Sequence, residues 1–131
     1  MIMNQATDYA FRAVNFLAKR PGEVIEAQTI AEVQVIPMRF LLKIMPSLIR
    51  AGIVNSFRGF GGGYTLAKEN KDITFLAVIE AIEGPLAINR CLRDPSECNR
   101  QAALFCKIHP ALAQIQSKFR EELKNHNFAE L

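Results

Sequence analysis

Three cysteines and a histidine lie close together in the last third of the chain, in the order Cys91, Cys98, Cys106 and His109. Thiolates are the usual protein ligands of iron–sulfur clusters, and imidazole nitrogen is a further ligand for iron. His109 follows Cys106 by three residues, so one helical turn would present both side chains to one site. This segment therefore predicts a site that holds iron.

Three kinds of chemistry suit these cysteines. An iron–sulfur cluster needs a fourth ligand besides the three thiolates. Structural zinc sites usually have cysteine pairs two to four residues apart, which the gaps of six and seven residues do not match. Without a metal, the cysteines would be small core residues or thiols that respond to oxidation. Their odd number, in a chain without an export signal, argues against a disulfide framework.

The elements that precede the cysteines have the order of a winged helix-turn-helix domain. A first helix is expected to follow Asn4. A short helix from Thr29 to about Val33, a turn, and a second helix from Pro37 to Gly52 would form the helix-turn-helix. Pro46 lies inside the second helix and predicts a kink there, or a break into two short helices.

Two short strands, 53–57 and 64–66, flank a glycine-rich turn, and a hairpin directly after a helix-turn-helix is a wing. A helix from Thr74 to Gly84, a polar loop over 90–100 and a final helix from about Pro110 to Asn125 follow. The expected fold is mainly α. Its parts are a winged helix-turn-helix DNA-binding domain with a small two-stranded wing (1–84), a cysteine-containing sensor loop (85–109), and a long C-terminal dimerisation helix with a tail (110–131).

The final helix carries a narrow apolar stripe, formed by Leu112, Ile115, Phe119 and Leu123. Such a stripe resembles a seam between two helices. It would pack on its own domain or on a second copy of the chain. Because the preceding domain has a core of its own, we favour a second copy, and therefore a homodimer.

Charge is distributed unevenly along the chain. The net charge is only +3, but no Asp or Glu occurs from Val33 to Lys68. A surface of one sign suits a polyanion, because each cation placed at a phosphate releases a condensed counterion. The alternative is a solvated surface that happens to lack acids. The side chains predicted to contact double-stranded DNA are Arg39, Phe40, Lys43, Ser47 and Arg50 in the helix, and Arg58, Gly61, Gly62, Gly63 and Tyr64 in the wing.

The run from Ile36 to Gly52, followed by residues 57–59 and 61–64, resembles the Rrf-two family of winged-helix regulators, which includes the IscR and NsrR types. Residues 7–10 and 79–84 also match, so the resemblance covers nearly the whole chain. It implies a bacterial homodimer that binds a pseudo-palindromic operator. It also implies that the final helix forms the dimer interface, so that two symmetric recognition helices contact two half-sites.

The resemblance also extends to the cysteines. It implies that Cys91, Cys98 and Cys106 hold a two-iron or four-iron cluster. His109 matches the histidine that is the fourth ligand in some members. Asp8 matches an acidic residue that serves in others and reaches across from the partner subunit. A carboxylate or imidazole ligand would leave one iron open to nitric oxide, to oxygen or to loss of the cluster.

The leading hypothesis is a DNA-binding regulator that senses iron–sulfur, redox or nitric oxide status through its cluster. The alternatives are a regulator of the same fold that senses by thiol oxidation or a protein partner, and a small iron–sulfur electron-transfer protein. Catalysis is not expected, since the chain has only two histidines and no nucleophile–base pair. No apolar run approaches the ~20 residues of a membrane helix. The first residues lack the features of a signal peptide, so a cytoplasmic protein without a membrane partner is expected.

Overall fold

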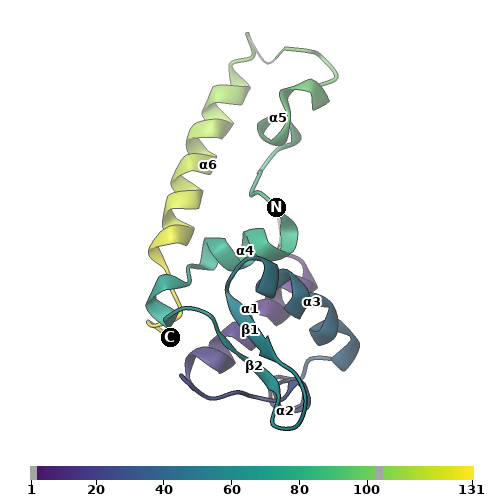
Figure 1. The fold of residues 1–131 in the computed structure, drawn as a ribbon. Coiled ribbons are helices and arrows are strands. Elements are labelled where there is room, and N and C mark those ends of the chain that lie inside the picture. Colours follow the sequence, from purple (N-terminus) through teal and green to yellow (C-terminus); the bar gives the residue numbers. More distant parts are fainter. Residues whose placement is uncertain (1–2, 103–104) are drawn as a thin grey trace.

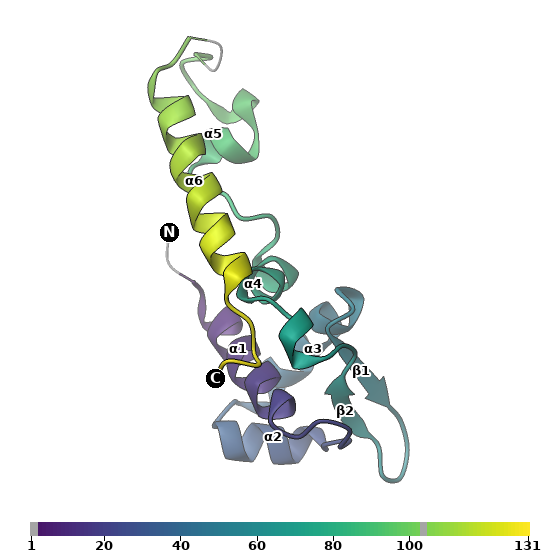
Figure 2. The ribbon, with the colours of Figure 1, turned by 90° about the vertical axis from the view of Figure 1, so that its left-hand side faces the viewer.

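A computed structural model describes residues 3–102 and 105–131 of the protein. It has two regions: a helical domain with a small hairpin, and a region that extends away from this domain along one long helix (Figures 1 and 2). The elements, in chain order, are α1 (Gln5–Ala18), α2 (Ala27–Gln34), α3 (Met38–Arg50), β1 (Val54–Phe57), β2 (Gly63–Leu66), the 3-10 turn η1 (Asn70–Asp72), α4 (Phe75–Glu83), α5 (Arg90–Arg93), the 3-10 turn η2 (Pro95–Glu97) and α6 (Ile108–Asn125).

The first helix begins where the sequence predicts. The Asn4 side chain accepts a hydrogen bond from the Thr7 amide at 2.8 Å and so satisfies a free N–H of the first turn. The second helix begins at Ala27, two residues before the expected start at Thr29. Its cap, Glu26, makes no side-chain hydrogen bond to the helix, so this start has no capping signature in the sequence.

The second helix of the helix-turn-helix, α3, is one continuous helix. Pro37 occupies the cap position just before it, with φ −57° and ψ 133°. The expected break at Pro46 is wrong, since α3 runs through this residue to Arg50. A proline at 46 removes the hydrogen bond to the carbonyl of Leu42. Both residues are exposed, so water can satisfy that carbonyl and the helix can continue.

The core of the domain lies between α1, α3 and α4. Each of these helices turns apolar side chains inward, and of the three only α3 has a largely exposed outer face. The antiparallel wing of β1 and β2 pairs Val54 with Leu66 and Phe57 with Gly63. The fully buried side chains with the largest volumes in this core are Val14, Leu17, Ile30, Leu41, Met45, Leu48, Ile53, Val54, Ile73, Val78 and Ile79.

The cysteine segment is more ordered than expected. The predicted polar loop over 90–100 contains the short helix α5 and the turn η2, which the sequence analysis missed. Local side-chain caps build both: the Asn89 side chain accepts from the Arg90 amide, and the Asp94 side chain accepts from the Ser96 amide, each at 2.9 Å. The final helix α6 begins at Ile108, two residues before the expected start at Pro110.

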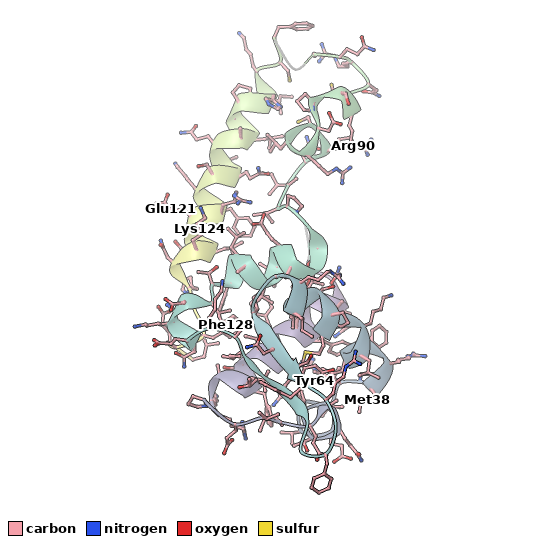
Figure 3. The ribbon with its side chains drawn as sticks, in the orientation of Figure 1. Met38, Tyr64, Arg90, Glu121, Lys124 and Phe128 are labelled. Atoms are coloured by element: carbon pink, nitrogen blue, oxygen red, sulfur yellow. The ribbon has the colours of Figure 1, made fainter. Side chains whose placement is uncertain are left out.

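The chain ends by returning to the domain. Phe128, beyond α6, is buried and lies 5.7 Å from the ring of Phe11 and 5.1 Å from that of Phe75, measured between centroids. The Phe75 amide donates to the carbonyl of His126 at 3.0 Å. Figure 3 shows Phe128 at the domain, whereas Arg90 in α5 lies at the far end of the molecule. The helix α6 therefore connects the two regions and is tied down at its domain end.

Candidate DNA-binding surface and cysteine site

The outer face of α3 is cationic. Leu41, Ile44, Met45 and Leu48 face the core, which leaves Arg39, Lys43 and Arg50 exposed on the other side. Ser47 lies on this outer side and accepts a hydrogen bond from Arg50 at 3.2 Å. The exposed cations are thus spaced to contact successive phosphates or base edges along a groove.

Two predicted DNA contacts have packing roles as well. Phe40 is half-buried, with its ring 5.6 Å from that of Tyr9. Tyr64 is half-buried, and its backbone pairs with Ile25 through hydrogen bonds of 2.9 and 2.8 Å. Met38 at the start of α3 and Tyr64 in the wing lie at the same end of the molecule (Figure 3). The half-buried rings of Phe40 and Tyr64 therefore pack beneath the surface that carries the exposed cations.

The wing projects from the domain beside α3 (Figure 2). Arg58 and Gly61 are exposed near its tip, and Gly62 and Gly63 are half-buried. A Cβ at Gly63 would collide with the carbonyl of Ile25, so only glycine lets the wing lie against the chain that enters α2. The wing and α3 share the acid-free stretch of the sequence and form one cationic surface.

The three cysteines lie around one hollow at the far end of the molecule. This hollow has a volume of about 400 Å³. Cys91 comes from α5, Cys98 directly follows η2, and Cys106 precedes α6. The lining residues are Asn89, Arg90, Cys91, Glu97, Cys98, Asn99, Arg100, Cys106, Ile108 and His109. The fold therefore brings together all four ligands that the sequence predicts within this segment.

His109 lies inside α6, and its Nδ1 is 3.3 Å from the sulfur of Cys91. The expectation that it precedes the helix is wrong, because the helix starts earlier. The Asn89 side chain donates to the same sulfur at 3.5 Å. Backbone N–H groups of Ala102 and then Arg100 hydrogen-bond to the sulfur of Cys98 and lower the pKa of this thiol.

The side chains around the hollow include the donor types of an iron–sulfur cluster, but they do not form a ready-made site for a metal ion. Within 3–102 and 105–131, no group of three His, Cys, Asp or Glu side chains converges on one point where a metal ion could sit. Three thiols and an imidazole around one hollow are the donor chemistry that iron–sulfur clusters use.

Asp8 is not near the cysteines within one chain. It lies in the first turn of α1, and its carboxylate forms an ion pair with Arg12 at 2.8 Å. The hollow is lined by residues of α5 and of the start of α6, and these elements lie away from α1 in the ribbon (Figure 1). A role for Asp8 as a cluster ligand therefore stays a prediction that concerns a partner subunit.

The connection between the two regions was missed by sequence analysis. The Glu80 carboxylate in α4 accepts from Arg120 of α6 at 2.7 Å and from the Leu86 amide at 2.8 Å. The Gln116 side chain of α6 accepts from the Ile88 amide at 2.9 Å. The contacts of Gln116 and Arg120 join residues 28 and 40 positions apart in the sequence, and no local motif indicates them.

Fold and surface together define the class, a winged helix-turn-helix DNA-binding protein. A family model named Rrf2 and described as an iron-dependent transcriptional regulator matches residues 3–131. The chain belongs to the Rrf2 family. This confirms the family and the mainly helical winged fold predicted from the sequence. Members are DNA-binding transcriptional regulators, so the protein is a regulator and not an enzyme.

Several relatives match over most of their length. A protein of Aquifex aeolicus (strain VF5), named "Putative HTH-type transcriptional regulator", is 31% identical over 131 residues, which is 100% of this chain and 91% of the relative. The structure of T. potens IscR aligns with a TM-score of 0.76 and 25% identity, covering 98% of this chain and 84% of that one.

CymR, the global cysteine regulator of B. subtilis, is a further structural relative. It aligns with a TM-score of 0.70 and 25% identity, over 98% of this chain and 94% of its own. An oxidized form of CymR from Staphylococcus aureus aligns with a TM-score of 0.69. In the described ranges of the present chain, no helix is both long and apolar enough to cross a membrane.

Proposed function

We propose that this protein is a cytoplasmic, homodimeric regulator whose affinity for double-stranded operator DNA depends on an iron–sulfur cluster at Cys91, Cys98 and Cys106. The observation that carries the proposal is the shared hollow, which collects three thiols from separate elements. His109 is our choice for the fourth ligand, since its imidazole already contacts Cys91. When bound, such a cluster supplies a centre that responds to oxidants and nitric oxide. The domain division at 84/85 and 109/110 is part of the same proposal.

The contacts around α4 support coupling between the cysteine segment and the DNA-binding domain. Residues 84–89 connect α4 to the cysteine segment. Near its start this connection is held by the hydrogen bond from the Leu86 amide to Glu80, and near its end by the one from the Ile88 amide to Gln116. At the domain side, Glu83 accepts a hydrogen bond from the buried Thr7 hydroxyl in α1. A change in the cysteine segment would therefore act on α4, which packs against α3. Coupling itself requires two states with different contacts.

The exposed face of α6 supports the homodimer. Of the predicted stripe, Leu112 and Leu123 are half-buried against the chain itself, whereas Ile115 and Phe119 are 57% and 41% exposed. Ile108 extends this exposed face by two turns toward the cysteines and is also exposed. A second copy would bury these side chains through the same face. Ile115→Glu should give a monomer in sedimentation equilibrium, whereas Gln114→Glu, beside the face, should stay dimeric. A monomeric wild-type chain would contradict the proposal.

The cluster is tested by measuring iron and acid-labile sulfide per chain, with the visible spectrum, on protein purified without oxygen. Wild-type protein should contain both, and Cys98→Ala should contain neither. Ser96→Ala is the control, because it changes the same loop and leaves the donors intact. His109→Ala should retain a less stable cluster. A Cys98→Ala variant that keeps full iron and sulfide would contradict the ligand assignment, and an unchanged His109→Ala would favour Asp8 of the partner subunit.

DNA binding is tested by titrating a selected duplex at several salt concentrations. Affinity should fall steeply with salt, because phosphate contacts release counterions. Arg39→Ala and Arg58→Ala should weaken binding and reduce this salt dependence, whereas Lys118→Ala, on exposed α6, should not. Unchanged affinity in both arginine variants would contradict the proposed surface.

A second candidate function uses the thiols without a cluster. The lowered pKa of Cys98 favours its thiolate, which is the form that reacts with oxidants. In that case, wild-type protein would contain no iron, and oxidation of Cys98 would change DNA affinity. Membership of a regulator family leaves no support for the third alternative, an electron-transfer protein.

A further inference from the structure

Phe60 at the tip of the wing is fully exposed. Its relative solvent exposure is 111%, the highest among the large apolar side chains that the structure describes. No contact within the chain accounts for it, since Phe60 is absent from the core and from the side chains packed against it. The sequence analysis did not select this residue, although it lies in the segment predicted to meet DNA.

The backbone around Phe60 forms a fixed, narrow turn. Gly59 and Gly61 on either side have φ of 85° and 78°, which favours glycine. The Gly62 amide donates to the carbonyl of Gly59 at 3.0 Å and closes the turn. Phe60 is therefore flanked by Gly59, Gly61 and Gly62, and within this four-residue turn its ring is the one large side chain.

The wing that carries this tip is held at its base. Tyr64 pairs with Ile25 through two backbone hydrogen bonds, and Gly63 lies directly against the Ile25 carbonyl. Phe60 is thus presented on a short hairpin with a defined position relative to the domain. Because the backbone that carries Phe60 is positioned by these contacts, insertion into a groove would have to order mainly the ring itself.

Charge near the tip selects the partner. Arg58 precedes Phe60 by two residues, and no carboxylate occurs between 33 and 68. The charged side chains of α3 and the wing are all positive, and this suits the negative phosphate backbone of DNA. A protein or lipid partner would not require positive charge over both elements. The minor groove of B-DNA is about 6 Å wide, and apolar side chains on narrow elements enter it as wedges between base steps.

We propose that Phe60 inserts into the minor groove of the operator as an apolar wedge, unstacks one base step in each half-site and bends the DNA. The inference rests on the proposed DNA binding and adds a residue and a DNA deformation to it. The preferred step should be pyrimidine–purine, because such steps unstack most easily. Arg58 would hold the flanking phosphates while the ring occupies the groove.

The experiment starts from a duplex selected with wild-type protein from a random pool. Dyes at its two ends report bending by energy transfer, and 2-aminopurine placed at successive steps reports unstacking. Wild-type protein should bring the ends closer and raise 2-aminopurine fluorescence at one step per half-site. Phe60→Ala should abolish both signals and weaken binding on the order of ten-fold, with an unchanged salt slope. Phe60→Leu should keep most of the bend, because leucine also serves as a wedge.

Two controls separate the outcomes. Leu131→Ala removes an exposed apolar side chain at the end of the chain and should bind and bend DNA like wild type. Thermal unfolding should be the same for all variants, since Phe60 makes no core contact. Wild-type affinity and bending in Phe60→Ala would overturn the wedge and leave the proposed function standing. Failure of the wild-type chain to select or bind any duplex would overturn both.

Discussion

The helices α1 and α6 are the two longest in the described chain, and they are packed in opposite ways. α1 has seven buried residues along 14, whereas α6 has none along 18. The first is held by apolar contacts inside a core. The second contacts its own chain through half-buried Leu112 and Leu123, through a hydrogen bond that Gln116 accepts and through one that Arg120 donates. The domain therefore buries its apolar side chains within one chain, whereas α6 leaves Ile108, Ile115 and Phe119 exposed.

The largest expected difference between the two regions concerns stability. Leu41→Ala removes a fully buried side chain of α3, and the resulting cavity should lower the free energy of unfolding by about 2–5 kcal/mol. Ile115→Ala, on exposed α6, should change the stability of the isolated chain by less than about 0.5 kcal/mol. Urea denaturation at low protein concentration measures both. An equal loss of unfolding free energy in the two variants would contradict the proposed difference in packing between the domain and α6.

A smaller effect is expected where the domain meets α4. Thr7 is fully buried, and its hydroxyl bonds to Glu83 of α4 and to Asn4. Thr7→Val keeps the shape but removes the hydrogen bonds of the hydroxyl, which should cost about 1 kcal/mol, since Asn4 and Glu83 are exposed and can bond to water instead. Thr7→Ser is the matched control, because it retains the hydroxyl, and it should recover most of the loss in the same denaturation measurement. A valine variant as stable as the serine variant would argue against this contact.

The link between α4 and α6 should depend weakly on pH. Burial alone would raise the pKa of Glu80, but hydrogen bonds from Arg120 and the Leu86 amide outweigh it and lower the pKa below its ordinary value of 4.5. The pair therefore stabilises the docked α6 above pH 4.5, and this contribution is lost as the pH falls through the lower, folded-state pKa. Since both side chains are partly exposed, the effect should be about 1 kcal/mol.

Amide hydrogen exchange at Leu86 measures this link directly. Exchange in wild-type protein should be slow at pH 7, and correction for intrinsic rates should show faster opening below pH 4. Glu80→Gln should show the faster opening at both pH values. If the variant and the wild type open equally at pH 7, the ion pair does not hold the segment.

The smallest expected effect concerns thiol reactivity in the exposed region. In reduced, iron-free protein, alkylation of Cys98 should follow a pH profile with its midpoint below the ordinary 9.0, since backbone N–H groups favour the thiolate. Mass spectrometry of the labelled peptide gives the rate at each pH. The same cysteine in urea-unfolded protein is the control, and it should titrate at its ordinary value. Coincident profiles would mean that the turn after Cys98 has no influence on the thiol.

Sequence reasoning predicted the domain better than the cysteine region for a physical reason. Helical periodicity, the Asn4 cap and the glycine-rich turn are local signals, and they indicated α1, α3 and the wing correctly. Pro46 misled the analysis because its effect depends on whether the lost hydrogen bond faces water, and burial is a property of the fold.

Contacts between distant residues were beyond such reasoning. The apolar stripe of α6 was treated as one face, but packing on the chain itself covers Leu112 and Leu123 and leaves Ile115 and Phe119 exposed. The burial of Phe128 against Phe11 and Phe75 joins the chain end to its beginning. The cysteines, in contrast, can be selected from residue type, spacing and the family resemblance, but the hollow that they line is formed by α5, η2 and the start of α6.

The return of the tail to the domain has a mechanical consequence. The amide of Phe75, at the start of α4, bonds to His126, and the end of α4 leads through 84–89 toward the cysteines. The chain thus runs from α4 through α5 and α6 and returns to α4, where the hydrogen bond between Phe75 and His126 closes the path. The cysteine hollow lies on the far side of this path. A change in the cysteine segment would therefore reach α4 from both of its ends, and α3 packs against this helix.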